Sequence, residues 1–155
     1  QAYYFWGQFS AKGAKMNPDL KTLDWSTYVD GIVTEADHYF HEGSYVIKRG
    51  EYYYLFVSID FCCRGKNSTY RMVVGRSKDI KGPYLDDSGK AMSRGGYKPI
   101  KSSSEKWVAA GHCGVHHIDG KDILVAHAYS AQSGESQLII KEIEWDEDGW
   151  PDIEL

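Results

Sequence analysis

One carboxylate stands where it could serve as an acid catalyst. Glu42 opens a predicted β-hairpin in residues 41–57, HEGSYVIKRGEYYYLFV. The aromatic side chains of Tyr39, Phe40 and Tyr45 would partly remove its carboxyl group from water. A carboxyl group in such surroundings holds its proton more tightly, which is what a general acid requires. The alternative is an exposed loop glutamate without a chemical role.

The loop after the second strand of this hairpin carries side chains suited to a polyol ligand. Arg64 offers a planar fork of N–H donors, and Ser68 and Tyr70 offer hydroxyl groups. The ring of Phe61 can stack on a sugar ring. These residue types predict a carbohydrate-binding loop, although Asp60 and Arg64 could instead pair with each other and brace the turn.

His112 holds the place in a later unit that Glu42 holds in its own, within the sequence GHCG of residues 111–114. An imidazole there could ligate a central ion or bond to a sugar. A histidine that only supports the fold is the alternative. Three other histidines lie within predicted strands on alternating faces, so they are not expected to converge on a metal: His116, His117 and His127.

The elements that would position these residues recur along the chain. Residues 50–58 and 120–128 each consist of a turn glycine, two linking residues and an apolar run, and residues 1–8 fit the same register. A pairing strand precedes the two complete copies, at residues 44–49 and 114–118, but not the first copy. We therefore expect the chain to start inside a repeat.

This recurrence predicts an all-β fold, namely a partial β-propeller of about three blades. The chain is expected to form one domain with units at about residues 1–34, 42–95 and 112–155. A β-sandwich also uses short strands, but nearly unbroken apolar runs such as YYYLFV favour inner strands covered on both faces. The strands are expected at residues 2–9, 13–17, 25–32, 44–49, 52–59, 69–77, 113–118, 122–129 and 137–144, with a long connection at 86–105.

Composition supports a folded domain and excludes two classes of partner. Apolar residues make up 42% of the 155 residues, which is enough for a packed core. The net charge is −4 and the lysines and arginines are dispersed, so nucleic acid is not an expected partner. No apolar run approaches the roughly 20 residues that span a bilayer, so no membrane partner is expected. No localisation follows from these features.

The three cysteines are predicted to be free thiols. Cys62 and Cys63 are adjacent, and neighbouring residues in a strand point to opposite faces, so a disulfide between them would be strained. The spacing of these cysteines and of Cys113 also lacks the C-x2-C pattern of zinc sites.

The motifs of the hairpin and loop resemble a known family. The sequence EGSYVIKR, the sequence DFCCRG and the sequence STY are similar to the E-A-P-Y-I-x-K-R, D-x-C-C-x-G and S-T-Y patterns of family 43 glycoside hydrolases, especially arabinan-degrading ones. WVAAGHCGV and ILVAHAYS resemble later blades of that family. The resemblance covers nearly the whole chain but only the second half of a five-bladed propeller.

The resemblance implies roles for particular residues. Glu42 corresponds to the general acid of an inverting arabinanase, and Phe61, Cys62, Arg64, Ser68 and Tyr70 to its substrate-binding loop. His112 corresponds to a histidine that helps to hold one central Ca²⁺ or other ion, with Cys113 in place of asparagine. An arabinan-like plant polysaccharide or oligosaccharide is the implied substrate.

The resemblance also implies a general base and a third carboxylate in earlier blades, whose H-D-P and I-D-P motifs this sequence lacks. Asp19, Asp24 and Asp30 are assigned to outer turns and are poor substitutes. We therefore expect self-association or pairing with a complementary N-terminal fragment through apolar blade faces. The alternative is a truncated, non-catalytic propeller remnant that binds plant cell-wall glycans.

Overall fold

The computed structural model describes residues 1–34 and 41–155, and this part of the chain contains eleven strands and two short 3₁₀ helices. The predicted all-β class is confirmed. Neither helix has the length and apolar character needed to cross a bilayer. The elements are β1 (Tyr3–Trp6), β2 (Lys12–Met16), β3 (Leu23–Val29), β4 (His41–Arg49), β5 (Tyr52–Ile59), η1 (Gly65–Asn67), β6 (Arg71–Ser77), η2 (Met92–Arg94), β7 (Lys98–Pro99), β8 (Trp107–Ile118), β9 (Lys121–Ser130), β10 (Ser136–Trp145) and β11 (Pro151–Ile153).

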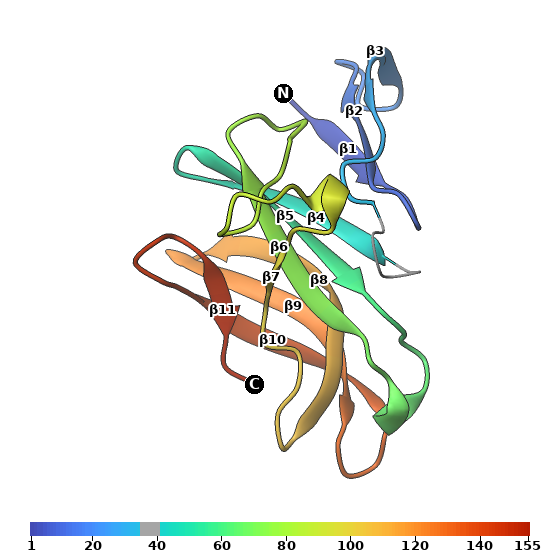
Figure 1. The fold of residues 1–155 in the computed structure, drawn as a ribbon, viewed down its shortest axis with the longest axis vertical. Coiled ribbons are helices and arrows are strands. Elements are labelled where there is room, and N and C mark those ends of the chain that lie inside the picture. The colour runs from blue at the N-terminus through green and yellow to red at the C-terminus, as the bar shows by residue number, and fades with distance from the viewer. Residues whose placement is uncertain (35–40) are drawn as a thin grey trace.

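The strands form three antiparallel sheets that follow one another along the chain (Figure 1). The first sheet has the order β1-β2-β3, the second β4-β5-β6-β7 and the third β8-β9-β10-β11. Each sheet is a meander of sequential neighbours, as propeller blades are, and the longest connection within a sheet joins β6 to β7. Asp119 and Gly120 both have positive φ (50° and 81°), which is the geometry of a tight turn between β8 and β9.

The observed strand limits differ from the predicted ones mainly in the third sheet. β8 begins at Trp107 rather than at residue 113, and its pairing with β9 shifts register on both sides of Gly111. These shifts break the alternation on which the prediction depended. The long connection at residues 86–105 contains β7, which pairs with β6 as the outer strand of the second sheet.

The second sheet is covered on both faces. Leu55 and Val57 of β5 belong to a core cluster shared with Ile32 and Val33, next to the first sheet. Phe56, between them in sequence, belongs to a second cluster that includes Val115 and Leu124 of the third sheet. Because successive side chains of a strand point to opposite faces, the apolar run of β5 serves both clusters.

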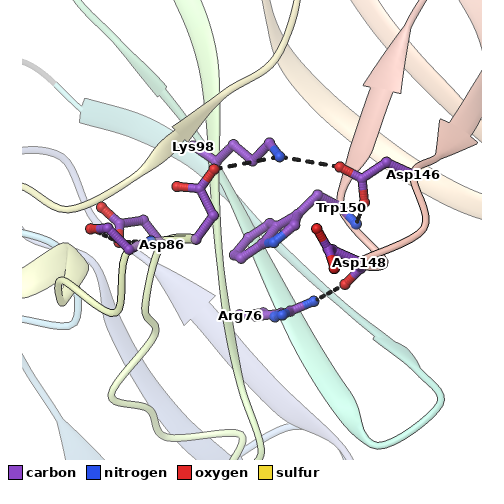
Figure 2. A network of polar contacts seen from close by, with 8 residues as sticks. Arg76, Asp86, Lys98, Asp146, Asp148 and Trp150 are labelled. Carbon is purple, nitrogen blue, oxygen red and sulfur yellow. Dashed lines mark hydrogen bonds and ion pairs between the residues drawn. The ribbon is translucent and has the colours of Figure 1, made fainter.

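At the outer edge, contacts of Trp150, Arg76 and Lys98 with the turn at residues 146–149 join the second sheet to the third (Figure 2), and this group is called the clamp below. The buried ring of Trp150 lies between two cations, with the Arg76 guanidinium 4.3 Å and the Lys98 ammonium 5.4 Å from its centroid. Arg76 also donates to the carbonyl of Asp148 at 2.6 Å, and Lys98 pairs with Asp146 at 3.2 Å. The turn before β11 is therefore fixed to the strands β6 and β7.

Trp150→Ala should lower the free energy of unfolding by about 3–5 kcal/mol, since it leaves a cavity and removes both cation–π contacts. Denaturant unfolding followed by circular dichroism measures the change. The matched control is Trp25→Ala, because Trp25 is 66% exposed, and its loss should stay near 1 kcal/mol or less. Equal losses of unfolding free energy in the two variants would contradict the stabilising role of the contacts around Trp150.

Candidate active site

Glu42 is the second residue of β4 and pairs with Ser58 of β5. The register of this pairing shifts between Glu42 and Tyr45, so a bulge lies directly after the carboxylate. The Glu42 side chain is 29% exposed, which leaves it half-buried but accessible to a ligand. The predicted flanking residues Tyr39 and Phe40 lie outside the described residues.

Gly43 makes the bulge possible. Its φ of +63° lies in the left-handed region, which side chains disfavour. A Cβ atom at this position would also lie 3.1 Å from Cγ of His112, closer than ordinary contact. The family pattern has Ala-Pro at this place, whereas this chain has Gly43-Ser44. The glycine allows a backbone conformation that brings β4 close to His112. The hydroxyl oxygen of Ser44 is buried and has no hydrogen-bond partner among the described residues.

Two polar side chains from other strands meet the Glu42 carboxyl group. The Tyr70 hydroxyl donates to Glu42 Oε1 at 2.9 Å. His112 Nδ1 lies 3.8 Å from the same oxygen and 3.4 Å from the Tyr70 hydroxyl. Burial raises the pKa of Tyr70, so its phenol stays neutral and keeps its proton for donation. The three predicted residues therefore form one cluster.

His112 is held by its backbone rather than by its ring. Its φ is +53° within the irregular part of β8, and its N–H donates to Ser58 Oγ at 2.7 Å. The imidazole itself is 56% exposed. An exposed ring on a fixed backbone can reach a ligand without moving the strand.

Cys113 does not line the site. Its side chain is only 4% exposed and belongs to the core between the second and third sheets. Burial raises the pKa of its thiol to about 12, so the group is neutral. Among residues 1–34 and 41–155, no three His, Cys, Asp or Glu side chains converge as a metal cluster. His112 is thus a single imidazole, not part of a formed set of ligands.

The predicted substrate loop connects β5 to β6, and two of the residues predicted to bind the substrate, Phe61 and Arg64, are exposed in it. The Arg64 guanidinium lies 4.6 Å from the centroid of the Phe61 ring, and that ring is 37% exposed. Asp60 forms an ion pair with Arg71 at 2.6 Å. This pair ties the beginning of the loop to the first residue of β6.

The other residues predicted to bind the substrate are buried or half-buried: Cys62, Ser68 and Tyr70. Ser68 is buried, and its Oγ accepts a hydrogen bond from the Arg64 N–H at 3.0 Å. Cys62 packs beside Tyr70 and Tyr129, and burial is the main cause that raises its thiol pKa to about 11. All three cysteines are free, as predicted.

Three residues near the site were not predicted from the sequence. The His127 ring stacks on that of Tyr70, with centroids 5.7 Å apart and planes at 19°. Burial, and then the nearby His112, lower the His127 pKa. Tyr129 accepts the N–H of Cys63 at 2.8 Å, and Ser58 holds His112. His127 and Tyr129 are two residues apart in sequence and therefore lie on the same face of β9. This spacing could have indicated that both face the site, but only with the shifted register of β8 against β9 already known.

The fold and this cluster can be compared with known proteins. Residues 1–151 match the family described as Glycosyl hydrolases family 43. The chain belongs to this family. The chain spans less than half the length of the curated relatives described below and about half of the solved structures.

Two curated relatives are named as an arabinofuranosidase and an arabinanase. The extracellular exo-alpha-(1->5)-L-arabinofuranosidase ArbA of Cellvibrio japonicus is 39% identical over 163 residues, which cover 97% of this chain and 46% of that protein. The extracellular endo-alpha-(1->5)-L-arabinanase 1 of Bacillus subtilis is 48% identical over 101 residues, covering 64% of this chain and 30% of that protein.

Solved structures agree with the family assignment. The alpha-L-arabinanase of Cellvibrio cellulosa in complex with arabinohexaose superposes with a TM-score of 0.88 at 35% identity, covering 98% of this chain and 52% of that one. An exo-1,5-alpha-L-arabinanase from a bovine ruminal metagenomic library gives 0.87 at 36% identity, with coverages of 99% and 52%. The predicted fold, about three blades of a five-bladed β-propeller, is confirmed.

Proposed function

We propose that this chain forms the acid-bearing part of an arabinanase-type glycosidase that hydrolyses alpha-L-arabinofuranosidic bonds of arabinan with inversion. The observation that carries the proposal is the half-buried Glu42 carboxyl group, whose Oε1 accepts the Tyr70 hydroxyl at 2.9 Å. Membership of family 43 and the names of the relatives support the choice of substrate.

In this mechanism Glu42 donates its proton to the glycosidic oxygen as the bond to the leaving sugar breaks. A water molecule on the opposite face of the ring attacks the anomeric carbon after a second carboxylate removes its proton. Inverting enzymes place the two carboxyl groups about 6.5–9.5 Å apart to leave room for that water. The acid then regains a proton from solvent.

The second carboxylate is proposed to come from blades outside this sequence. The three aspartates considered as substitutes accept hydrogen bonds from other residues of the first sheet and its turns, and Asp24 lies in β3 rather than in a turn. Asp19 accepts from the N–H of Lys21 at 2.9 Å, and Asp24 from the Ser26 hydroxyl at 2.6 Å. Asp30 accepts from the N–H of Gly31 at 2.7 Å. These contacts favour a local structural role.

The loop between β5 and β6 is proposed to bind the sugar. Phe61 would stack on a furanose ring and Arg64 would donate to its hydroxyl groups, because both side chains are exposed and adjacent. Cys62, Ser68 and Tyr70 are buried or half-buried, so they would support this subsite from inside the loop rather than contact the sugar. The second candidate function, glycan binding without hydrolysis, uses the same loop and differs only in having no base. Assay on debranched arabinan separates the two functions.

Glu42→Gln should lower hydrolysis of an unactivated arabino-oligosaccharide by about 10²- to 10⁴-fold, because the amide keeps the shape of the side chain but has no proton to transfer. The rate is measured with this chain in complex with whichever partner, a second copy or an N-terminal part of the propeller, gives arabinan hydrolysis. Glu51→Gln is the matched control, since this glutamate at the far end of the same hairpin is 79% exposed and should not affect the rate. A wild-type rate for Glu42→Gln would exclude this residue as the acid.

We also propose that His112 is a protein ligand of one central Ca²⁺ or other cation. Its Nδ1 faces Tyr70 and Glu42, which leaves Nε2 for the ion. His112→Ala should then remove or weaken the bound cation and lower activity more than stability. Elemental analysis with calcium titration measures this, and His117→Ala is the control, since that ring is 69% exposed and pairs with Asp122. Unchanged cation content together with full activity would assign His112 a structural role only.

The two end sheets present apolar faces that a partner is proposed to cover. They lie at opposite ends of the stack in Figure 1. Trp25 is 66% exposed on the first sheet, and Leu138 and Ile140 are 68% and 62% exposed on the third. Ile139, between them, belongs to the core, so the exposed pair lies on the outer face. The proposed partner is a second copy or a complementary N-terminal part of the propeller.

At micromolar concentration, sedimentation should therefore show species larger than the 17.6 kDa chain. Leu138→Glu should shift the distribution toward the monomer, because it places a charge in the apolar contact. Glu147→Gln, in the exposed turn before β11, should leave the distribution unchanged. A stable monomer with cooperative unfolding would contradict the association.

A further inference from the structure

We propose that Tyr70 is a positioning residue that selects which oxygen of Glu42 carries the transferable proton. This inference rests on the proposed role of Glu42 as the general acid. Tyr70 would direct the proton to Oε2 by occupying Oε1, so that the carboxyl group meets the glycosidic oxygen in one orientation.

The contacts around the carboxyl group are asymmetric. The Tyr70 hydroxyl donates to Oε1 at 2.9 Å, and His112 Nδ1 is 3.8 Å from the same oxygen. The carbonyl oxygen of a neutral carboxyl group is a better hydrogen-bond acceptor than its hydroxyl oxygen, so the oxygen that accepts from Tyr70 is the poorer place for the proton. The proton of the neutral acid is therefore expected on Oε2.

The direction of the Tyr70 hydrogen bond follows from the chemistry of the carboxyl group. A carboxylate, and the unprotonated oxygen of a neutral carboxyl group, can only accept a hydrogen bond. The Tyr70 hydroxyl is therefore the donor in its 2.9 Å contact with Glu42 Oε1. His112 Nδ1 lies 3.4 Å from the Tyr70 hydroxyl oxygen and can donate to it in the tautomer that carries a hydrogen on Nδ1.

The Tyr70 ring has little freedom to move. It is 2% exposed and stacks on His127 with centroids 5.7 Å apart. On another side it lies against Gly111, where an added Cβ atom would be 2.1 Å from ring atoms Cδ1 and Cε1. The Tyr70 N–H donates to the Phe61 carbonyl at 3.1 Å. A ring fixed in this way places its hydroxyl group at a constant distance from Glu42.

Tyr70→Phe tests the inference because it removes the hydroxyl group and keeps the ring. In the hydrolytically active assembly of the full chain, kcat on an unactivated arabino-oligosaccharide should fall by about 10- to 100-fold, the effect of one lost hydrogen bond to a reacting group. KM should change little. The rate on 4-nitrophenyl alpha-L-arabinofuranoside should fall only a few-fold, because a good leaving group needs little protonation.

Other roles for Tyr70 give different results and would overturn the inference. A sugar-binding role would raise KM on both substrates, and a purely structural role would lower both rates equally along with the melting temperature. Tyr84→Phe is the matched control, since Tyr84 is fully buried and donates to the Ile80 carbonyl at 2.6 Å in the connection between β6 and β7. It should keep wild-type rates on both substrates.

The failure of the acid assignment is distinguishable from the failure of this inference. If Glu42→Gln is fully active, the acid assignment is wrong and this inference falls with it. If Glu42→Gln is inactive and Tyr70→Phe retains the wild-type oligosaccharide rate, the acid stands and the positioning role is wrong.

Discussion

The geometry of the candidate site depends on the register of β5, which is buried on both faces. Leu55 and Val57 face the core next to the first sheet, and Phe56 faces the core next to the third. A slip by one residue would exchange these side chains between the two cores, so the packing fixes the register. Ser58 continues the same strand, and this register places its hydroxyl group under the His112 N–H. The apolar core thus sets a polar contact of the site.

The site itself is formed where the regular pleat is interrupted. β4 is bulged after Glu42 and β8 is bulged on both sides of Gly111. Bulges change the direction in which neighbouring side chains point. The two glycines at these places, Gly43 and Gly111, let the strands approach His112 and Tyr70 more closely than any larger residue would. Regular strands supply the stability, and these irregular positions bring the carboxyl, phenol and imidazole groups together.

Sequence patterns predicted the features that depend on local periodicity. The inner strands, the three units and the position of Glu42 followed from apolar runs and turn glycines, and β5 lies where it was expected. The start of β8 could not be predicted, because positive φ values at Ala109 and His112 interrupt the alternation. The contacts of Ser58 and His127 could not be predicted either, since they join different strands and depend on how the sheets stack.

The outer clamp has a consequence for the order in which the chain folds. Tyr54 donates to the carbonyl of Gly149, 95 residues away, and Arg76 to that of Asp148, 72 residues away. Contacts between such distant residues require large loops to close first, and proteins rich in them fold slowly. The hairpins, whose strands are joined by short turns, can form early by comparison. Closure of the clamp would therefore come late, after the hairpins that it joins have formed.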